Sequence, residues 1–111
     1  MKKEFVNYTR EDGVAVVTID RPPMNAFDAQ TRAELADILD ELSQRKNEVR
    51  VVILTGAGEK AFVSGADIRM LRDRTKEEAW ADSKPTIQFF LKLEESETPV
   101  ICAIKGYCLG A

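Results

Sequence analysis

The feature that most constrains this chain is the run from Val49 to Gly56, which is almost continuously apolar and rich in β-branched residues. A strand with one solvated face alternates apolar and polar side chains, whereas a strand covered on both faces has a continuous apolar run. Such runs are typical of parallel sheets, whose crossover connections place helices against the sheet. The run therefore predicts a central parallel strand in an α/β fold.

Strand and helix signals surround this run in an order that suits an α/β chain with right-handed crossovers. The turn residues Glu11-Asp12-Gly13 lie between two segments rich in β-branched and aromatic residues, which predicts a hairpin. The predicted strands are residues 5–9, 14–19, 49–56 and 100–104, and residues 61–67 form a short small-residue segment. The predicted helices are residues 29–46 with Asp28 as N-cap, a short helix capped by Asp67, and a helix through Ile87, Phe90 and Leu91.

The helix after Asp28 is expected to bury one face. Its apolar residues follow the helical period, at Leu35, Ile38, Leu39 and Leu42. The acidic residues between them are expected on the solvated face, at Glu34, Asp37, Asp40 and Glu41. The charged stretch 72–78 is also expected to be exposed, and Pro85 marks either the first turn of the last helix or a kink in it.

Composition excludes several classes of function. The 111 residues suit one domain, residues 1–111, and the balance of 16 Lys and Arg against 19 Asp and Glu gives a net charge of -3, which argues against a nucleic-acid partner. No apolar run approaches the roughly 18 residues of a membrane span. The chain has 0 His, so Ser-His and Cys-His pairs and His-ligated zinc are excluded within it, and no metal is expected.

The two cysteines, Cys102 and Cys108, do not form a C-x-x-C pair. Cys102 lies in an apolar run, where cysteine is expected as a small buried hydrophobic residue. The N-terminal residues lead directly into strand-like sequence without a leader-like apolar region. These features predict a reducing compartment and a cytoplasmic location.

Residues Gly56–Ala61 match the G-x-G-x-x-A pattern of dinucleotide-binding loops. That loop must open directly into a long helix, whereas the residues that follow, Phe62-Val63-Ser64-Gly65, are poor helix formers. A simple turn is therefore the favoured interpretation, and a nucleotide-binding oxidoreductase domain is a weaker alternative. Ser64 has neither an imidazole partner nor a nucleophile elbow around it, which favours a structural serine.

Two small-residue turns, each after an apolar strand, form the candidate site: Ser64–Asp67 and Gly106–Ala111. Small side chains let a ligand approach the backbone, and a turn that enters a helix leaves N–H groups unpaired. Two such N–H groups that converge on one oxygen form an oxyanion hole. On spacing alone, ordinary turns rich in Gly and Ala remain the alternative.

Four segments resemble motifs of the enoyl-CoA hydratase/isomerase (crotonase) family, in the family's order and across the whole chain. They are Arg21–Phe27 (R-P-x-x-N-A-[LF]), Val51–Gly56 (V-V-[VI]-L-T-G), Ala61–Ile68 (A-F-x-[AS]-G-A-D-[IL]) and Thr98–Gly110 (K-P-V-I-A-A-[VI]-x-G-x-x-x-G). The resemblance implies the N-terminal portion of an α/β, crotonase-like (ClpP/crotonase) spiral of ββα units. It also implies that the fold is truncated after the strand that leads to the second oxyanion-hole turn.

The resemblance assigns roles to particular residues. It implies that the backbone N–H groups of Ala66 and Ala111 form the oxyanion hole, although many members have Gly where Ala111 stands. The residues implied to bind the CoA thioester are Asn25, Ala26, Phe27, Ala66, Asp67, Ile68, Arg69 and Ala111. The basic residues Arg21, Lys60 and Arg69 are either contacts to CoA phosphates or ordinary surface charges.

The implied parent activity is enoyl-CoA hydration, with an acyl-CoA substrate and no cofactor other than the coenzyme A of that substrate. Family hydratases use two Glu residues as acid and base, at positions beyond Ala111. Because Glu94, Glu95 and Glu97 are expected to be surface charges, the chain alone is predicted to be inactive. The alternatives are an isomerase, dehalogenase, decarboxylase or CoA hydrolase of the same family, or a non-catalytic CoA-binding or assembly module. The family also implies a homo-trimer or hexamer.

Overall fold

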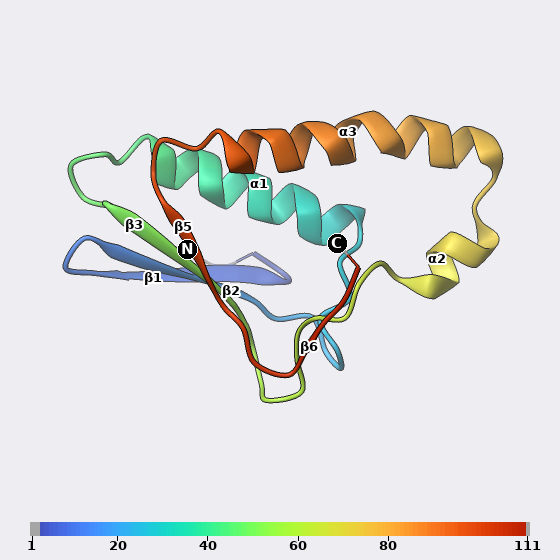
Figure 1. Cartoon of the computed structure of the whole chain (residues 1–111), viewed down its shortest axis with the longest axis horizontal. Coiled ribbons are helices and arrows are strands. Elements are labelled where there is room, and N and C mark those ends of the chain that lie inside the picture. Colours follow the sequence, from blue (N-terminus) through green and yellow to red (C-terminus); the bar gives the residue numbers. More distant parts are fainter. Residues whose placement is uncertain (1–2, 111) are drawn as a thin grey trace.

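The computed structural model describes residues 3–110, in which two long helices cover one side of a mixed sheet (Figure 1). The elements follow the order β1 (Val6–Glu11), β2 (Val14–Ile19), α1 (Ala29–Ser43), β3 (Val51–Gly56), β4 (Ala61–Val63), α2 (Ile68–Asp73), α3 (Lys76–Glu94), β5 (Val100–Ala103) and β6 (Tyr107–Cys108). The predicted strands and helices occur in the predicted order, and β4 and β6 are strands that the sequence analysis did not predict.

The larger sheet has the strand order β1-β2-β3-β5. β1 and β2 form the predicted antiparallel hairpin, and its turn residues Asp12 and Gly13 have φ values of 52° and 81°. Positive φ at both central residues is the geometry that a tight hairpin turn requires. β3 is parallel to both of its neighbours, β2 and β5, which confirms the prediction from the apolar run.

The core lies between α1 and the sheet. Leu35, Ile38 and Leu42 of α1 are at most 1% exposed, and buried residues alternate with half-buried ones along β2. Burial of each such side chain contributes about 1.5–3 kcal/mol, which fixes this helix face against the strands. The Asp28 carboxylate caps α1, as predicted, by accepting the Thr31 N–H at 2.8 Å.

One acidic residue of α1 contradicts the expectation of a solvated face. Glu34 is only 9% exposed, and its carboxylate accepts hydrogen bonds from the backbone N–H groups of Phe5 at 2.8 Å and Val6 at 3.2 Å. Buried backbone donors must find an acceptor, and here the acceptor comes from a helix 28 residues away in the sequence. The helical spacing of apolar residues alone does not reveal that a distant backbone donor needs this acceptor.

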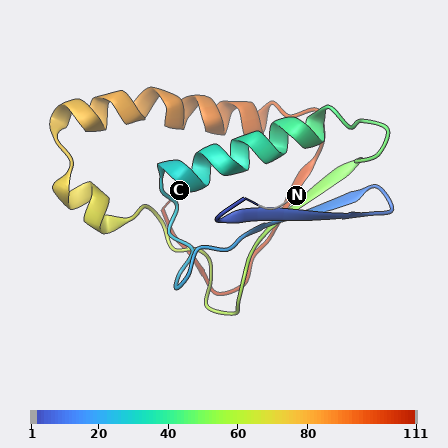
Figure 2. The ribbon, with the colours of Figure 1, turned by 180° about the vertical axis from the view of Figure 1, so that it is seen from behind.

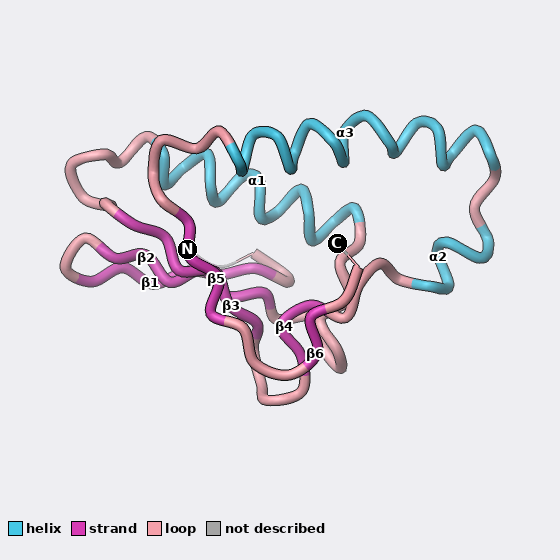
Figure 3. Tube along the Cα trace, in the orientation of Figure 1, coloured by secondary structure: helices cyan, strands magenta, loops and turns pink. Residues whose placement is uncertain are grey.

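The expectation that Cys102 is buried is also wrong. β5 is the edge strand of the larger sheet (Figure 3). Ile101, Cys102 and Ala103 are exposed. Only Val100 at its start packs against the core. The apolar character of this strand is therefore not matched by burial, because no element of residues 3–110 covers its outer side.

The short helix α2 is capped by Asp67, as predicted, whereas α3 begins earlier in the chain than expected. α3 already begins at Lys76, inside the stretch expected to be merely charged, and the Thr75 hydroxyl caps it by accepting the Glu78 N–H at 3.1 Å. Pro85 lies inside α3, so its placement in the first turn is wrong. α3 runs beside α1 over the sheet (Figure 2). Among the helices of residues 3–110, none is long and apolar enough to cross a membrane.

Candidate functional site

The turn between β4 and α2 holds the first predicted oxyanion-hole donor. Gly65 has a φ of 104°, a conformation that residues with a side chain rarely adopt. Two residues later, the Asp67 carboxylate caps α2 by accepting the Arg69 N–H at 3.0 Å, and this bond is the main reason why the pKa of Asp67 is lowered. A glycine that permits an unusual backbone angle and a capping carboxylate therefore lie on the two sides of Ala66.

The second small-residue turn lies directly beside the first. β4 and β6 are parallel, and the Leu109 N–H donates to the Val63 carbonyl at 3.0 Å. A Cβ atom added at Gly110 would lie 3.1 Å from the Gly65 Cα, and one added at Gly65 would lie 3.2 Å from the Leu109 carbonyl oxygen. A side chain at either position would therefore press tightly against the other turn. Ala111, the predicted second donor, lies outside the described residues.

Ala66 stands at the junction of two cavities. Within residues 3–110 its N–H donates no hydrogen bond to another protein atom. The α2 cavity, of about 390 Å³, is lined by residues that include Arg21, Met24, Ala26, Ala66, Ile68 and Arg69. The α3 cavity, also of about 390 Å³, is lined by residues that include Phe27, Ala66, Met70, Leu71, Ile87 and Phe90. An unpaired N–H at such a junction can meet an oxygen of a ligand that occupies both cavities.

Asn25, a predicted CoA-binding residue, has its side chain turned into the protein. It is 4% exposed, and its amide group donates to the carbonyls of Ala57 at 3.1 Å and Ala61 at 2.9 Å. Its side-chain oxygen accepts the Arg21 N–H at 2.9 Å. These bonds satisfy the side chain and tie residues 21–25 to the loop between β3 and β4. Asn25 therefore supports the site through these hydrogen bonds, and its side chain does not face the cavities.

The basic residues proposed to contact CoA phosphates differ in how many ion pairs they form within the protein. The Arg21 guanidinium lies 3.2 Å from an Asp28 oxygen and 3.5 Å from an Asp67 oxygen, and it stacks over the Phe5 ring. It thus joins the capping carboxylates of α1 and α2. The Arg69 side chain is 77% exposed at the α2 cavity, and Lys60 is exposed on the loop before β4. Although its Nε lies 3.5 Å from an Asp67 oxygen, Arg69 is the more exposed of the two basic groups that line that cavity.

A charged cluster in the wall of the α3 cavity was missed by the sequence analysis. Arg32 donates to Thr86 at 2.6 Å and to Asp82 at 2.9 Å, and Arg74 lies 3.6 Å from the other Asp82 oxygen. The Arg32 hydrogen bond is the main cause that lowers the pKa of Asp82. No local motif marks these residues, because they come from α1, α3 and the α2–α3 connection.

The loop Gly56–Ala61 has the structure of a turn between two strands. It leads into β4 and not into a helix, so it lacks the helix N-terminus that a dinucleotide pyrophosphate needs. Gly56 is required for packing, since a Cβ atom there would lie 2.5 Å from the Phe62 carbonyl oxygen. The prediction of a simple turn is confirmed. In residues 3–110, no cluster of acidic, cysteine or histidine side chains could hold a metal ion.

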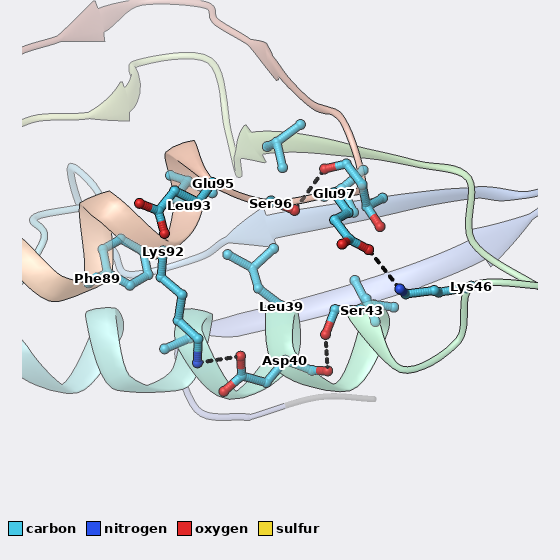
Figure 4. A pocket seen from close by; sticks show the side chains of 15 residues that line it. Leu39, Asp40, Ser43, Lys46, Phe89, Lys92, Leu93, Glu95, Ser96 and Glu97 are labelled. Carbon is cyan, nitrogen blue, oxygen red and sulfur yellow. Dashed lines mark hydrogen bonds and ion pairs between the residues drawn. The ribbon is translucent and has the colours of Figure 1, made fainter.

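A further cleft of about 360 Å³ lies between α1 and the C-terminal half of α3 (Figure 4). Ion pairs at its rim join Lys92 to Asp40 at 2.8 Å and Lys46 to Glu97 at 2.7 Å. It contains none of the residues of the two turns. Glu97, which the sequence analysis treats as a surface charge, is engaged at this rim and lies apart from Ala66.

Comparisons with known proteins match nearly the whole chain to one family. Residues 9–111 match the family described as enoyl-CoA hydratase/isomerase. The chain is 42% identical over 111 residues to the short-chain-enoyl-CoA hydratase of Clostridium acetobutylicum, a match that covers 99% of this chain and 42% of that protein. It is 39% identical over 113 residues to the fatty acid oxidation complex subunit alpha of Shewanella sp. strain MR-4, covering 99% of this chain and 16% of that protein.

Solved structures are similar over the same part of the chain. An enoyl-CoA hydratase/carnithine racemase from Magnetospirillum magneticum matches with a TM-score of 0.88 and 34% identity, covering 98% of this chain and 42% of that one. An enoyl-CoA hydratase from Thermoplasma volcanium matches with a TM-score of 0.84 and 30% identity, covering 93% and 41%. The chain therefore spans about two fifths of the length of these structures.

Proposed function

Because the chain belongs to the enoyl-CoA hydratase/isomerase family, as its match over residues 9–111 establishes, we propose that it acts on acyl-CoA thioesters and takes part in the hydration of 2-enoyl-CoA. The observation that carries the proposal is the close approach of Gly65 and Gly110, beside an Ala66 N–H that has no hydrogen-bond acceptor within residues 3–110. The fold agrees with this assignment, since it is the α/β fold of the family's solved structures. The proposed activity is that of a full-length relative. This chain matches 42% of the length of the Clostridium hydratase.

The proposed chemistry follows from the charge that develops on a thioester carbonyl. When water adds across the double bond of an enoyl thioester, the carbonyl oxygen gains the negative charge of an enolate. Backbone N–H groups fixed at that oxygen stabilise the enolate more than the neutral carbonyl, which lowers the barrier. We assign this role to the Ala66 N–H and to the N–H of Ala111.

The two cavities suggest how the substrate lies. With the thioester carbonyl at Ala66, the coenzyme A arm occupies the α2 cavity, where Ala26, Ile68 and the exposed Arg69 side chain are placed to contact it. The acyl group then extends into the α3 cavity, past Phe27. Substrate binding thus uses the turn residues themselves, and Asn25 and Asp67 contribute by holding the walls.

The acid and base of hydration are not assigned within this chain. Hydration needs a group that delivers a hydroxyl to the β carbon and one that protonates the α carbon. Glu95 and Glu97 line the cleft between α1 and α3, and neither lines the two cavities at Ala66. We therefore expect no hydration of crotonyl-CoA by the 111-residue chain alone, although it should bind the thioester.

The decisive experiment uses a chimera in which this chain replaces the segment that it matches in the Clostridium hydratase. We expect crotonyl-CoA hydration by the chimera, followed as loss of the conjugated thioester absorbance. Ala66→Pro removes the N–H and should lower the rate by about 10²–10³, the typical effect of losing one oxyanion-hole donor. Ala66→Ser keeps the N–H with a small side chain and is the matched control. Equal rates for the two variants would refute the assignment of Ala66.

A non-catalytic CoA-binding or assembly module is the second candidate, favoured by the lack of an acidic residue with an assigned catalytic role. It predicts that the 111-residue chain binds crotonyl-CoA and that the chimera binds it without turnover. The homo-trimer or hexamer implied by the family stays a prediction, which sedimentation of the chimera would test. Rapid hydration by the 111-residue chain itself would contradict our account of the missing acid and base.

A further inference from the structure

The direction of the Ala66 N–H is decided by the peptide unit that it shares with Gly65. This peptide is trans, and in a trans peptide the carbonyl and the N–H point in opposite directions. The Gly65 carbonyl accepts a hydrogen bond from the Phe27 N–H at 2.8 Å. The Ala66 N–H must therefore point away from Phe27, and any rotation of this peptide breaks that bond.

Gly65 itself provides little resistance to such a rotation. It has no side chain, and glycine accepts a wide range of backbone angles, including its φ of 104° here. The neighbouring turn limits its space but makes no hydrogen bond to its carbonyl among the bonds of residues 3–110. The Phe27 N–H is thus the restraint that holds the peptide at one orientation.

The Phe27 N–H is well suited to this role because the chain is held on both sides of it. Before it, the Asn25 carbonyl accepts the Ser64 N–H at 3.4 Å, and the Asn25 side chain is buried and fully engaged. After it, Asp28 caps α1. The Phe27 ring also packs against the Phe89 ring, with a centroid distance of 6.0 Å. The donor cannot simply follow the Gly65 carbonyl if that carbonyl turns.

We propose that the backbone N–H of Phe27 is a positioning donor, which aims the Ala66 N–H at the acyl oxygen of a bound thioester. This inference rests on the proposed function and deepens it. It gives Phe27 a role in addition to lining the α3 cavity, because its N–H preorganises the oxyanion-hole donor. Preorganisation matters because a donor that is already aimed needs no rearrangement as the charge develops.

The test replaces Phe27 by the corresponding α-hydroxy acid, so that an ester oxygen takes the place of the N–H in the full 111-residue chain. A matched control makes the same replacement at Asp20, whose N–H donates to the Phe5 carbonyl at 2.7 Å and does not contact Gly65. Residual dipolar couplings report the direction of the Ala66 N–H in each protein without any ligand. We expect the Ala66 N–H to change direction in the Phe27 ester and to keep it in the Asp20 ester.

A second measurement connects this direction to the substrate. Crotonyl-CoA labelled with ¹³C at the thioester carbonyl is bound to each protein, and the infrared carbonyl stretch reports polarisation by the N–H donor. We expect the shift to lower frequency to be lost in the Phe27 ester and kept in the Asp20 ester. An unchanged Ala66 N–H direction in the Phe27 ester would overturn the positioning role. If the unmodified chain does not bind the thioester, the proposed function fails, while the couplings still decide the positioning role.

Discussion

Replacement of Gly65 by alanine is expected to destabilise the protein by about 2–4 kcal/mol. Part of this loss is backbone strain, since a φ of 104° costs a residue with a side chain on the order of 1–3 kcal/mol. The rest comes from the new Cβ atom, which would lie 3.2 Å from the Leu109 carbonyl oxygen. Overpacking typically costs about 1–3 kcal/mol, and the lower part of that range applies because a shift of a few tenths of an ångström relieves the contact.

The assay is urea unfolding followed by circular dichroism, with Gly58→Ala as the matched control. Gly58 has a φ of 79°, but no described atom lies within 4 Å of a Cβ atom placed there. It therefore carries backbone strain alone, about 1–2 kcal/mol. The difference between the two variants contains the contact between the turns together with the difference in backbone strain between the two φ values, and only Gly65→Ala should weaken binding of crotonyl-CoA. Equal losses of stability, with binding unaffected, would refute the reasoning that the turns form one tight site.

Three further predictions test other parts of the structure. Glu34→Ala should destabilise the protein by about 2–4 kcal/mol in the urea assay, because two backbone N–H groups lose a charged acceptor. The control Asp37→Ala, on the exposed side of α1, should change stability by less than about 0.5 kcal/mol. The pKa of Asp82 is lowered from 3.8, so its pairing with Arg32 stabilises the fold above that pH and is lost as the pH falls through the lowered pKa. Thermal unfolding between about pH 5 and pH 2 should therefore show a smaller loss for Asp82→Asn than for the unmodified chain, and identical profiles would contradict this. Ile101→Lys on the edge strand should reduce association of the chain at high concentration in sedimentation experiments, because a charged edge resists strand pairing; unchanged sedimentation would show that this edge is not used.

Local patterns in the sequence were sufficient for most of the fold. The hairpin follows from turn chemistry at Asp12 and Gly13, the start of α1 from the capping residue Asp28, and the parallel strand β3 from its apolar run. Each of these depends on neighbours within a few positions. The family resemblance rests on short motifs of the same kind, and it correctly identified the family and its fold.

The errors arose where distant segments meet. Glu34 is buried because the start of β1 needs an acceptor, and Cys102 is exposed because β5 forms the edge of the sheet. The Arg32–Asp82 pair joins residues 50 positions apart. In each case the burial or pairing of a side chain depends on which helix or strand packs beside it. The local spacing of apolar and polar residues does not predict that neighbour.

The sequence by itself determined where the strands and helices lie and which two turns contain small residues. Only the tertiary structure decided that Gly65 and Gly110 pack against each other and that the Phe27 N–H donates to the Gly65 carbonyl. The physical reason is that every residue except proline carries the same backbone N–H and carbonyl groups. The direction of these backbone groups depends on the hydrogen-bond partners that lie beside them in the folded chain. The identities of the residues that carry the groups do not specify those partners.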